Sequence, residues 1–226
     1  MRKIIDENVS CLSWLGAGVY SVICSTNSAL SIASKVASTA LLTVLGARCI
    51  PAEKNALATT SFFFHCVGDL LIEVSPQSIE YAMLAFLIGH AFYIRLLNQN
   101  RLSPSELSRP RLLMMSGMTL YGAAFTQLLM SKTKGVVQCA IPVYVAALTI
   151  MFLLASMQRM RSKEFFLSAL MYVASDNLIG AREFLSFRFF GLNQLTWGLY
   201  YAGQRGMLNA LLTEDKDTFL MYSPRK

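Results

Sequence analysis

The chain alternates long apolar stretches with short polar gaps, and this alternation constrains the fold more than any other feature. The stretches are about 20 residues long, the length at which a helix crosses the roughly 30 Å hydrocarbon core of a bilayer. Only 15% of the residues are charged, whereas a soluble domain usually carries about 25%. The sequence therefore predicts an all-α fold, a polytopic membrane helix bundle that forms a single transmembrane domain over residues 1–226.

Charged or Pro/Asn-rich breaks divide the chain into eight predicted spans. They cover residues 9–26, 29–47, 55–74, 78–97, 111–130, 135–157, 165–181 and 189–212. The gaps are short, so consecutive helices should be antiparallel neighbours. The longest gap runs from Asn98 to Pro110 and is the best candidate for a mid-chain linker.

The distribution of Lys and Arg predicts the orientation of these spans. With eight spans, 15 of the 20 Lys and Arg residues fall on the side of the two termini, four fall on the opposite side, and Lys35 lies within a span. Basic residues are enriched in cytoplasmic loops, so both termini are expected in the cytoplasm. The membrane would be the cytoplasmic membrane of a bacterium or the endoplasmic reticulum of a eukaryote. This topology also accounts for the net charge of +7 without a nucleic-acid partner.

A weak internal repeat divides the eight spans into two units of four. Gly68-Asp69 and Ser175-Asp176 are 107 residues apart, and the same offset relates His90 to Trp197 and Tyr93 to Tyr200. An even number of helices per unit predicts two parallel four-helix repeats, with a site between the halves. Chance similarity between apolar helices is the competing explanation.

Ionisable groups within membrane spans are energetically unfavourable, and each is therefore a candidate for function. Asp69 and Asp176 are the strongest candidates, because a short carboxylate cannot reach far toward water and each follows a small residue. Tyrosine and glutamine side chains add hydrogen-bonding groups at the same depth. The full set of candidates is Lys35, His65, Asp69, Glu73, His90, Tyr93, Tyr144, Asp176, Tyr200, Tyr201 and Gln204.

Several of these groups also have a purely structural interpretation. Lys35 is close enough to its span end to extend toward the loop, and His65 could bond a neighbouring carbonyl. Glu73 lies at a span boundary, where it could be solvated, and Tyr200 and Tyr201 could belong to an interfacial aromatic belt.

Other kinds of chemistry are not indicated. His65, His90 and the aspartates lack HExxH or ExxH spacing, so we expect no metal site. The five cysteines form no CxxC pair, which argues against a disulfide framework. Walker, nucleotide-binding and GxSxG motifs are absent. A hydrolase with this sequence would have to work through carboxylates.

Five short motifs and one lysine resemble the YhhN-like family of lysoplasmalogenases in order and spacing, from about residue 30 to residue 212. The lysine is Lys35. The motifs are Val67-Gly68-Asp69-Leu70-Leu71, Gly89-His90-Ala91-Phe92-Tyr93, Tyr144 with Met151, Ala174-Ser175-Asp176 and Tyr200-Tyr201-Ala202-Gly203-Gln204. The sequence departs from the family pattern at Val36 and Asn177, which leaves the lipid preference open.

The resemblance implies an eight-helix membrane enzyme without a cofactor. It would cleave the vinyl ether of lysoplasmalogens to a fatty aldehyde and glycerophosphoethanolamine or glycerophosphocholine. Asp69 and Asp176 are then the expected catalytic pair, one as acid and one as base, in either order. Water and headgroup would be oriented by Lys35, His90, Tyr93, Tyr144, Tyr200, Tyr201 and Gln204.

Two other functions are compatible with the sequence. A small transporter or channel would use the same intramembrane Asp, His and Lys groups, although no span is clearly broken by a Gly/Pro pair. A membrane scaffold or lipid-binding protein would need no buried carboxylates. Aldehyde release from a lysoplasmalogen distinguishes the enzyme from both.

Overall fold

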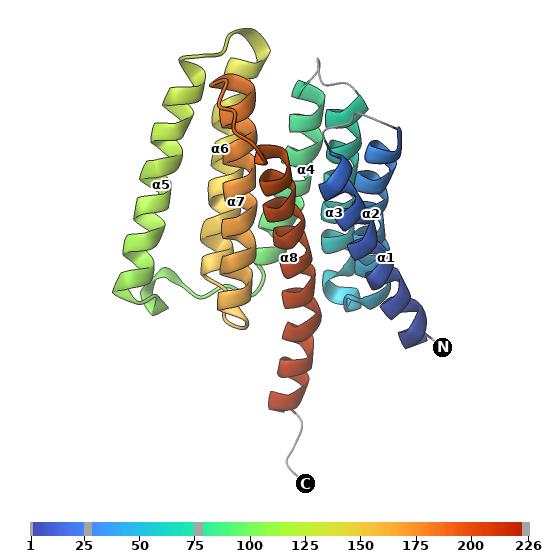
Figure 1. Ribbon diagram of the computed structural model, residues 1–226. Helices are drawn as coiled ribbons and strands as arrows, with labels where there is room; N and C mark the ends of the chain where they lie inside the picture. The colour runs from blue at the N-terminus through green and yellow to red at the C-terminus, as the bar shows by residue number, and fades with distance from the viewer. Residues whose placement is uncertain (1, 25–28, 75–78, 223–226) are drawn as a thin grey trace.

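The computed structural model describes residues 2–24, 29–74 and 79–222, and within this part of the chain the fold is an all-helical bundle without strands. The long helices run side by side (Figure 1). They are α1 (Arg2–Ile23), α2 (Ala29–Cys49), α3 (Ala52–Val74), α4 (Ile79–Leu97), α5 (Arg109–Met130), α6 (Gly135–Ser156), α7 (Ser162–Phe184) and α8 (Leu192–Tyr222). A short 3-10 helix, η2 (Pro104–Glu106), lies in the connection between α4 and α5, where the linker was predicted.

The predicted spans agree with these helices to within three residues except at the two ends of the chain. Helix α1 begins at Arg2 rather than at residue 9, and α8 continues to Tyr222 rather than ending at residue 212. In both places the helix continues through polar sequence, which a search for apolar residues cannot detect. Helix α8 also begins three residues later than predicted, because Ser186 and Gly191 in the preceding connection have positive φ angles of 56° and 83°.

Among the residues that the structure describes, five helices are long and apolar enough to cross a membrane: α2, α3, α4, α5 and α6. The protein is therefore an integral membrane protein. Helices α1, α7 and α8 carry more polar residues and do not meet the same measure, but they pack alongside the others in one bundle (Figure 1). For these three helices, membrane crossing remains a prediction.

The two halves of the chain, α1–α4 and α5–α8, each pack mainly through helices that are neighbours in sequence. Across the boundary, α4 packs on α6, and α8 packs on α1 and α2. Asp69 lies on α3 and Asp176 on α7, and the internal repeat stays a prediction.

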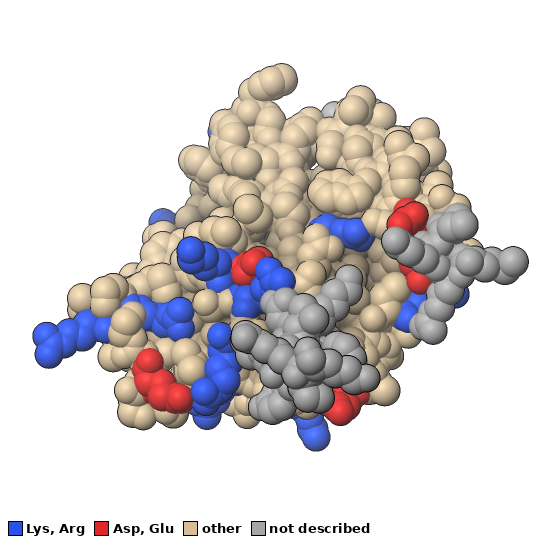
Figure 2. Space-filling model, turned by 90° about the horizontal axis from the view of Figure 1, so that it is seen from below, with Lys and Arg blue, Asp and Glu red and all other residues tan. Residues whose placement is uncertain are grey.

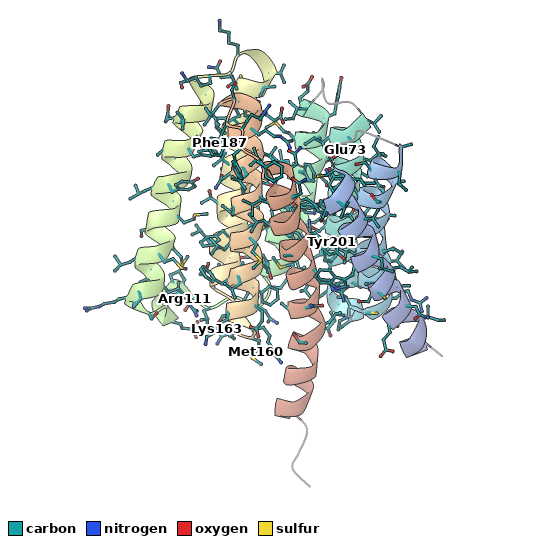
Figure 3. The ribbon with its side chains drawn as sticks, viewed as in Figure 1. Glu73, Arg111, Met160, Lys163, Phe187 and Tyr201 are labelled. Atoms are coloured by element: carbon teal, nitrogen blue, oxygen red, sulfur yellow. The ribbon has the colours of Figure 1, made fainter. Side chains whose placement is uncertain are left out.

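The two termini lie at the same end of the bundle, as an even number of antiparallel helices requires (Figure 1). Arg111 and Lys163 lie at this end, whereas Glu73 and Phe187 lie toward the opposite end (Figure 3). Seen from below, Lys and Arg side chains are spread over the end that carries the termini (Figure 2).

Glycines allow α3 and α4 to approach closely. A Cβ atom added to Gly89 would lie 2.6 Å from the His65 ring, and one added to Gly68 would lie 2.7 Å from the Phe86 ring. Neither ring can move easily, because His65 is 1% exposed and Phe86 is 8% exposed. Small residues at helix contacts are typical of membrane bundles.

We expect Gly89→Ala to lower the thermal unfolding temperature of the detergent-solubilised protein. The added methyl group would collide with a buried ring, and overpacking of this kind costs about 1–3 kcal/mol. The matched control is Gly117→Ala in α5, where nothing lies within 4 Å of an added Cβ. This control should be neutral or slightly stabilising, because alanine favours a helix by roughly 0.5–1 kcal/mol over glycine. Equal unfolding temperatures for the two variants would contradict the packing described here.

We also expect both termini to be cytoplasmic, because of the charge asymmetry. Alkaline phosphatase fused to the C-terminus should be inactive, and green fluorescent protein in the same place should fluoresce. The same reporters inserted between α5 and α6 should give the reverse result. An active C-terminal phosphatase would refute the predicted orientation.

Candidate active site

A polar cavity of about 610 Å³ lies at the end of the bundle opposite the termini. Its volume is within the roughly 300–1,000 Å³ typical of small-molecule sites. Residues of both halves form its wall, and they include three acidic and three basic side chains. These are Lys35, Asp69, Glu73, Asp176, Arg182 and Arg188. The two aspartates singled out in the sequence therefore face one cavity.

Asp69 is held on α3 by groups from two other helices. Its side chain is 2% exposed and lies 3.6 Å from Lys35 Nζ of α2. The Tyr200 hydroxyl of α8 donates a 2.8 Å hydrogen bond to Asp69 Oδ2. The Asp69 carboxylate is thus held between an ammonium group and a hydroxyl donor.

Lys35 is paired within the protein, with a residue near the last turn of α3. Its Nζ donates a 2.9 Å hydrogen bond to Glu73 Oε1, and the Lys35 side chain is only 10% exposed. The Tyr20 hydroxyl donates a second bond, of 2.7 Å, to the same oxygen. The Lys35 ammonium also lies 5.5 Å from the centroid of the Tyr20 ring and 5.7 Å from that of Trp197. Lys35 thus extends toward the end of the bundle at which α2 begins, and there it meets a carboxylate. Glu73, the penultimate residue of α3, lies at the span boundary and borders the polar cavity.

Asp176 has different neighbours. The Tyr144 hydroxyl of α6 donates a 2.7 Å hydrogen bond to Asp176 Oδ2. His90 Nε2 of α4 lies 3.6 Å from the same oxygen, and the Asp176 side chain is 8% exposed. The two carboxylates thus have unlike surroundings, a lysine and a tyrosine for Asp69 and a histidine and a tyrosine for Asp176. Unlike surroundings are the means by which enzymes give two carboxylates separate roles.

Two histidine rings pack edge to face behind Asp176. The His65 and His90 ring centroids are 5.1 Å apart. His65 Nδ1 lies 2.7 Å from the Ser61 carbonyl oxygen, so His65 satisfies a neighbouring carbonyl, one of the two interpretations from the sequence. Both ring nitrogens of His90 are buried and form no hydrogen bond with the described residues, and Asp176 is the acidic group nearest to them.

The remaining predicted residues do not line the cavity. The Tyr93 hydroxyl donates a 2.6 Å bond to Gln204 Oε1, and Gln204 Nε2 donates to the Tyr172 hydroxyl at 3.3 Å. Tyr201 lies 2.7 Å from Ser13 Oγ through its hydroxyl, between α8 and α1 in the view of Figure 3. These three residues tie helices together, and of the predicted orienting residues only Lys35 and Tyr200 line the polar cavity.

A second, mostly apolar pocket of about 60 Å³ adjoins the polar cavity. It lies between the two halves, with walls from α3 and α4 on one side and from α5, α6 and α7 on the other. The two pockets share Ile72, Phe86, Asp176 and Ile179. Asp176 is therefore the acidic residue that stands where the polar and apolar spaces meet.

Several residues of the cavity wall were not candidates from the sequence, among them Tyr20, Arg182, Arg188 and Trp197. The two arginines were counted only as loop charges, and the two aromatic residues have no charged residue within four positions in the sequence. Trp197 could have been found, because the internal repeat pairs it with His90.

No curated protein and no solved structure matches the chain. The model of the YhhN family matches residues 30–211, which include both aspartates, Lys35 and the helices that carry them. The chain belongs to the YhhN family.

Proposed function

We propose that the protein is a lysoplasmalogenase-like hydrolase that cleaves the vinyl ether of lysoplasmalogens. One observation carries the proposal: Asp69 and Asp176 face one polar cavity, and Asp176 also borders an apolar pocket. Membership in the YhhN family is consistent with this activity. An amphiphilic substrate suits such a site, with its headgroup in the polar cavity and the start of its alkenyl chain in the apolar pocket.

The chemistry of a vinyl ether requires an acid and an anion at the reacting atoms. Protonation of the alkenyl β-carbon produces an oxocarbenium ion, and water adds to this ion to form a hemiacetal. The hemiacetal collapses to a fatty aldehyde and the free hydroxyl of the glycerophospho headgroup. The reaction consumes one water and no net proton. The acid gives one proton to carbon, and the base takes one proton from the attacking water. To complete the cycle, a proton must return from the base to the acid.

The position of Asp176 makes it the proton donor in this scheme. The vinyl ether joins the chain to the headgroup, and Asp176 lies where the apolar pocket meets the polar cavity. The Tyr144 hydroxyl holds one of its oxygens in place. The proton taken from water at Asp69 would return to Asp176 through water in the polar cavity, which both carboxylates line.

Asp69 would be the ionised partner. Lys35 lies beside its carboxylate as a counter-ion and Tyr200 donates a hydrogen bond to it. An anion is needed both to stabilise the oxocarbenium ion and to accept a proton from water. The acid and the anion thus divide their roles as the two carboxylates of glycosidases do. The scheme uses only side chains of the protein and needs no cofactor.

We expect Asp176→Asn and Asp69→Asn each to reduce aldehyde release at least about 100-fold, since general acid–base catalysis alone contributes typically 10²–10⁴-fold. Asparagine keeps the volume but can neither donate an acidic proton nor carry the charge. The measurement is aldehyde release from a purified lysoplasmalogen by the detergent-solubilised protein.

The matched control is Asp6→Asn, the same substitution at a residue that pairs with Arg48 far from the cavity. This control should keep parental turnover. Near-parental turnover by either cavity variant would show that its aspartate is structural. If the parent itself releases no aldehyde, solute transport in proteoliposomes becomes the function to test.

We expect Lys35→Met to lower both stability and turnover, because it leaves Glu73 and Asp69 close together without their counter-ion. Loss of one partner of a buried ion pair typically costs about 3–5 kcal/mol. The double variant Lys35→Met/Glu73→Gln should recover much of the thermal stability but not the turnover. Lys163→Met, an exposed lysine at the other end of the bundle, is the control. Parental stability of the single variant would contradict the role of Lys35 as counter-ion.

A further inference from the structure

Two arginines on the wall of the polar cavity take no part in the chemistry proposed above. Arg182 lies in the last turn of α7, and Arg188 lies in the connection from α7 to α8. Both line the cavity together with Asn193 and the catalytic candidates. Both arginines therefore lie at the C-terminal end of α7, and the proposed reaction assigns them no role.

The deeper basic group of the cavity is already neutralised. Lys35 Nζ lies 2.9 Å from Glu73 and 3.6 Å from Asp69. A phosphate group brought to Lys35 would meet these two carboxylates and be repelled by them. Lys35, considered from the sequence as a group that orients the headgroup, is therefore a poor ligand for a phosphate.

Both arginines are held in place by bonds that leave part of each guanidinium group open. Arg182 Nε donates to Glu183 at 2.7 Å, and its Nη1 donates to Asn193 at 2.8 Å. Arg188 Nη1 donates to the Arg182 carbonyl and, at 3.3 Å, to the Phe187 carbonyl. Arg182 Nη2 and the Nε and Nη2 atoms of Arg188 have no hydrogen-bond partner among the described residues. The ion pair with Glu183 offsets part of the charge of Arg182, but the open N–H donors of both guanidinium groups can still bind phosphate oxygens.

The spacing along α7 fits the geometry of a lysophospholipid. Arg182 is six residues after Asp176, which places its Cα roughly 9 Å further along the helix axis at a rise of 1.5 Å per residue. In a lysoplasmalogen a glycerol unit separates the vinyl ether from the phosphate. An alkenyl group at Asp176 would thus bring the phosphate toward the arginines.

We propose that Arg182 and Arg188 bind the phosphate of a single-chain phospholipid and select it against neutral single-chain glycerolipids. The inference rests on the proposed function for the identity of the lipid. It adds a phosphate site, apart from the two aspartates, that determines which lipid headgroup enters the cavity.

Binding of two matched lipids to the full-length protein in detergent tests this site. One lipid is 1-palmitoyl lysophosphatidylethanolamine, which has an ester in place of the vinyl ether, and the other is 1-palmitoylglycerol, which lacks the phosphate. Isothermal calorimetry should show that the parent prefers the phosphate-bearing lipid at least about tenfold, as expected for charge-assisted hydrogen bonds. Arg182→Gln and Arg188→Gln should each lose most of this preference and leave the affinity for 1-palmitoylglycerol unchanged.

A control variant, a conservative variant and a competing anion test whether the preference comes from these arginines and from a lipid headgroup. Arg159→Gln, an exposed arginine at the opposite end that pairs with Glu106, should behave as the parent. Arg182→Lys keeps the charge but not the planar fork, and it should have an intermediate preference; it serves as the variant of Arg182 if the glutamine variant does not fold. Inorganic phosphate added to the parent should compete only weakly. Competition by free phosphate as strong as that by the lipid would overturn the assignment to a lipid headgroup.

Equal affinity of the parent for both lipids, or an unchanged preference in the folded arginine variants, would overturn the phosphate site. This result is distinct from failure of the proposed function. If the parent prefers the phosphate-bearing lipid through its arginines but releases no aldehyde, the phosphate site is supported and the proposed hydrolysis fails. If the arginine variants release aldehyde with the KM of the parent, the proposed hydrolysis is supported and the phosphate site fails.

Discussion

A lysine ammonium group paired with two carboxylates inside the helix bundle is the constraint on which the site depends. Charges in the membrane interior are tolerated only where they are neutralised or hydrated, and here Lys35 serves as counter-ion to Glu73 and Asp69 beside a polar cavity. The cluster joins α2 to α3, and the tyrosine hydroxyls of α1 and α8 complete its hydrogen bonds. The first and last helices of the chain are thereby fixed around the same group of charges.

The second carboxylate sits in a separate environment because it belongs to the other half of the bundle. Asp176 on α7 meets α4 and α6 through His90 and Tyr144 rather than the lysine cluster. The hydrogen bonds from Tyr93 to Gln204 and on to Tyr172 lie behind this site and connect α4, α8 and α7. The halves are therefore joined by polar groups on both sides of the cavity, and the carboxylates keep distinct partners.

The sequence was sufficient for the number of helices and for the two aspartates, because both follow from the mismatch between polar residues and a hydrocarbon solvent. It was insufficient for the neighbours of those aspartates. Tyr200 and Tyr201 are adjacent on a helix and point about 100° apart, so only Tyr200 faces the cavity. Arg182 and Arg188 have long flexible side chains at a helix end, and their sequence positions do not determine whether they turn outward to water or inward to the cavity. The pairing of Lys35 with Glu73 depends on the packing of α2 against α3, which no local pattern encodes.

The polar cavity and the two termini occupy opposite ends of the bundle, and this arrangement gives the protein a sidedness. With both termini in the cytoplasm, as the charge asymmetry predicts, a water-soluble molecule leaves the cavity into the other compartment, whereas a hydrophobic molecule stays in the bilayer. The two products of the proposed reaction would thus part at the moment they form. Cellular enzymes that use the aldehyde could reach it from the membrane, but those that use the headgroup would have to act, or be supplied by a carrier, on the far side.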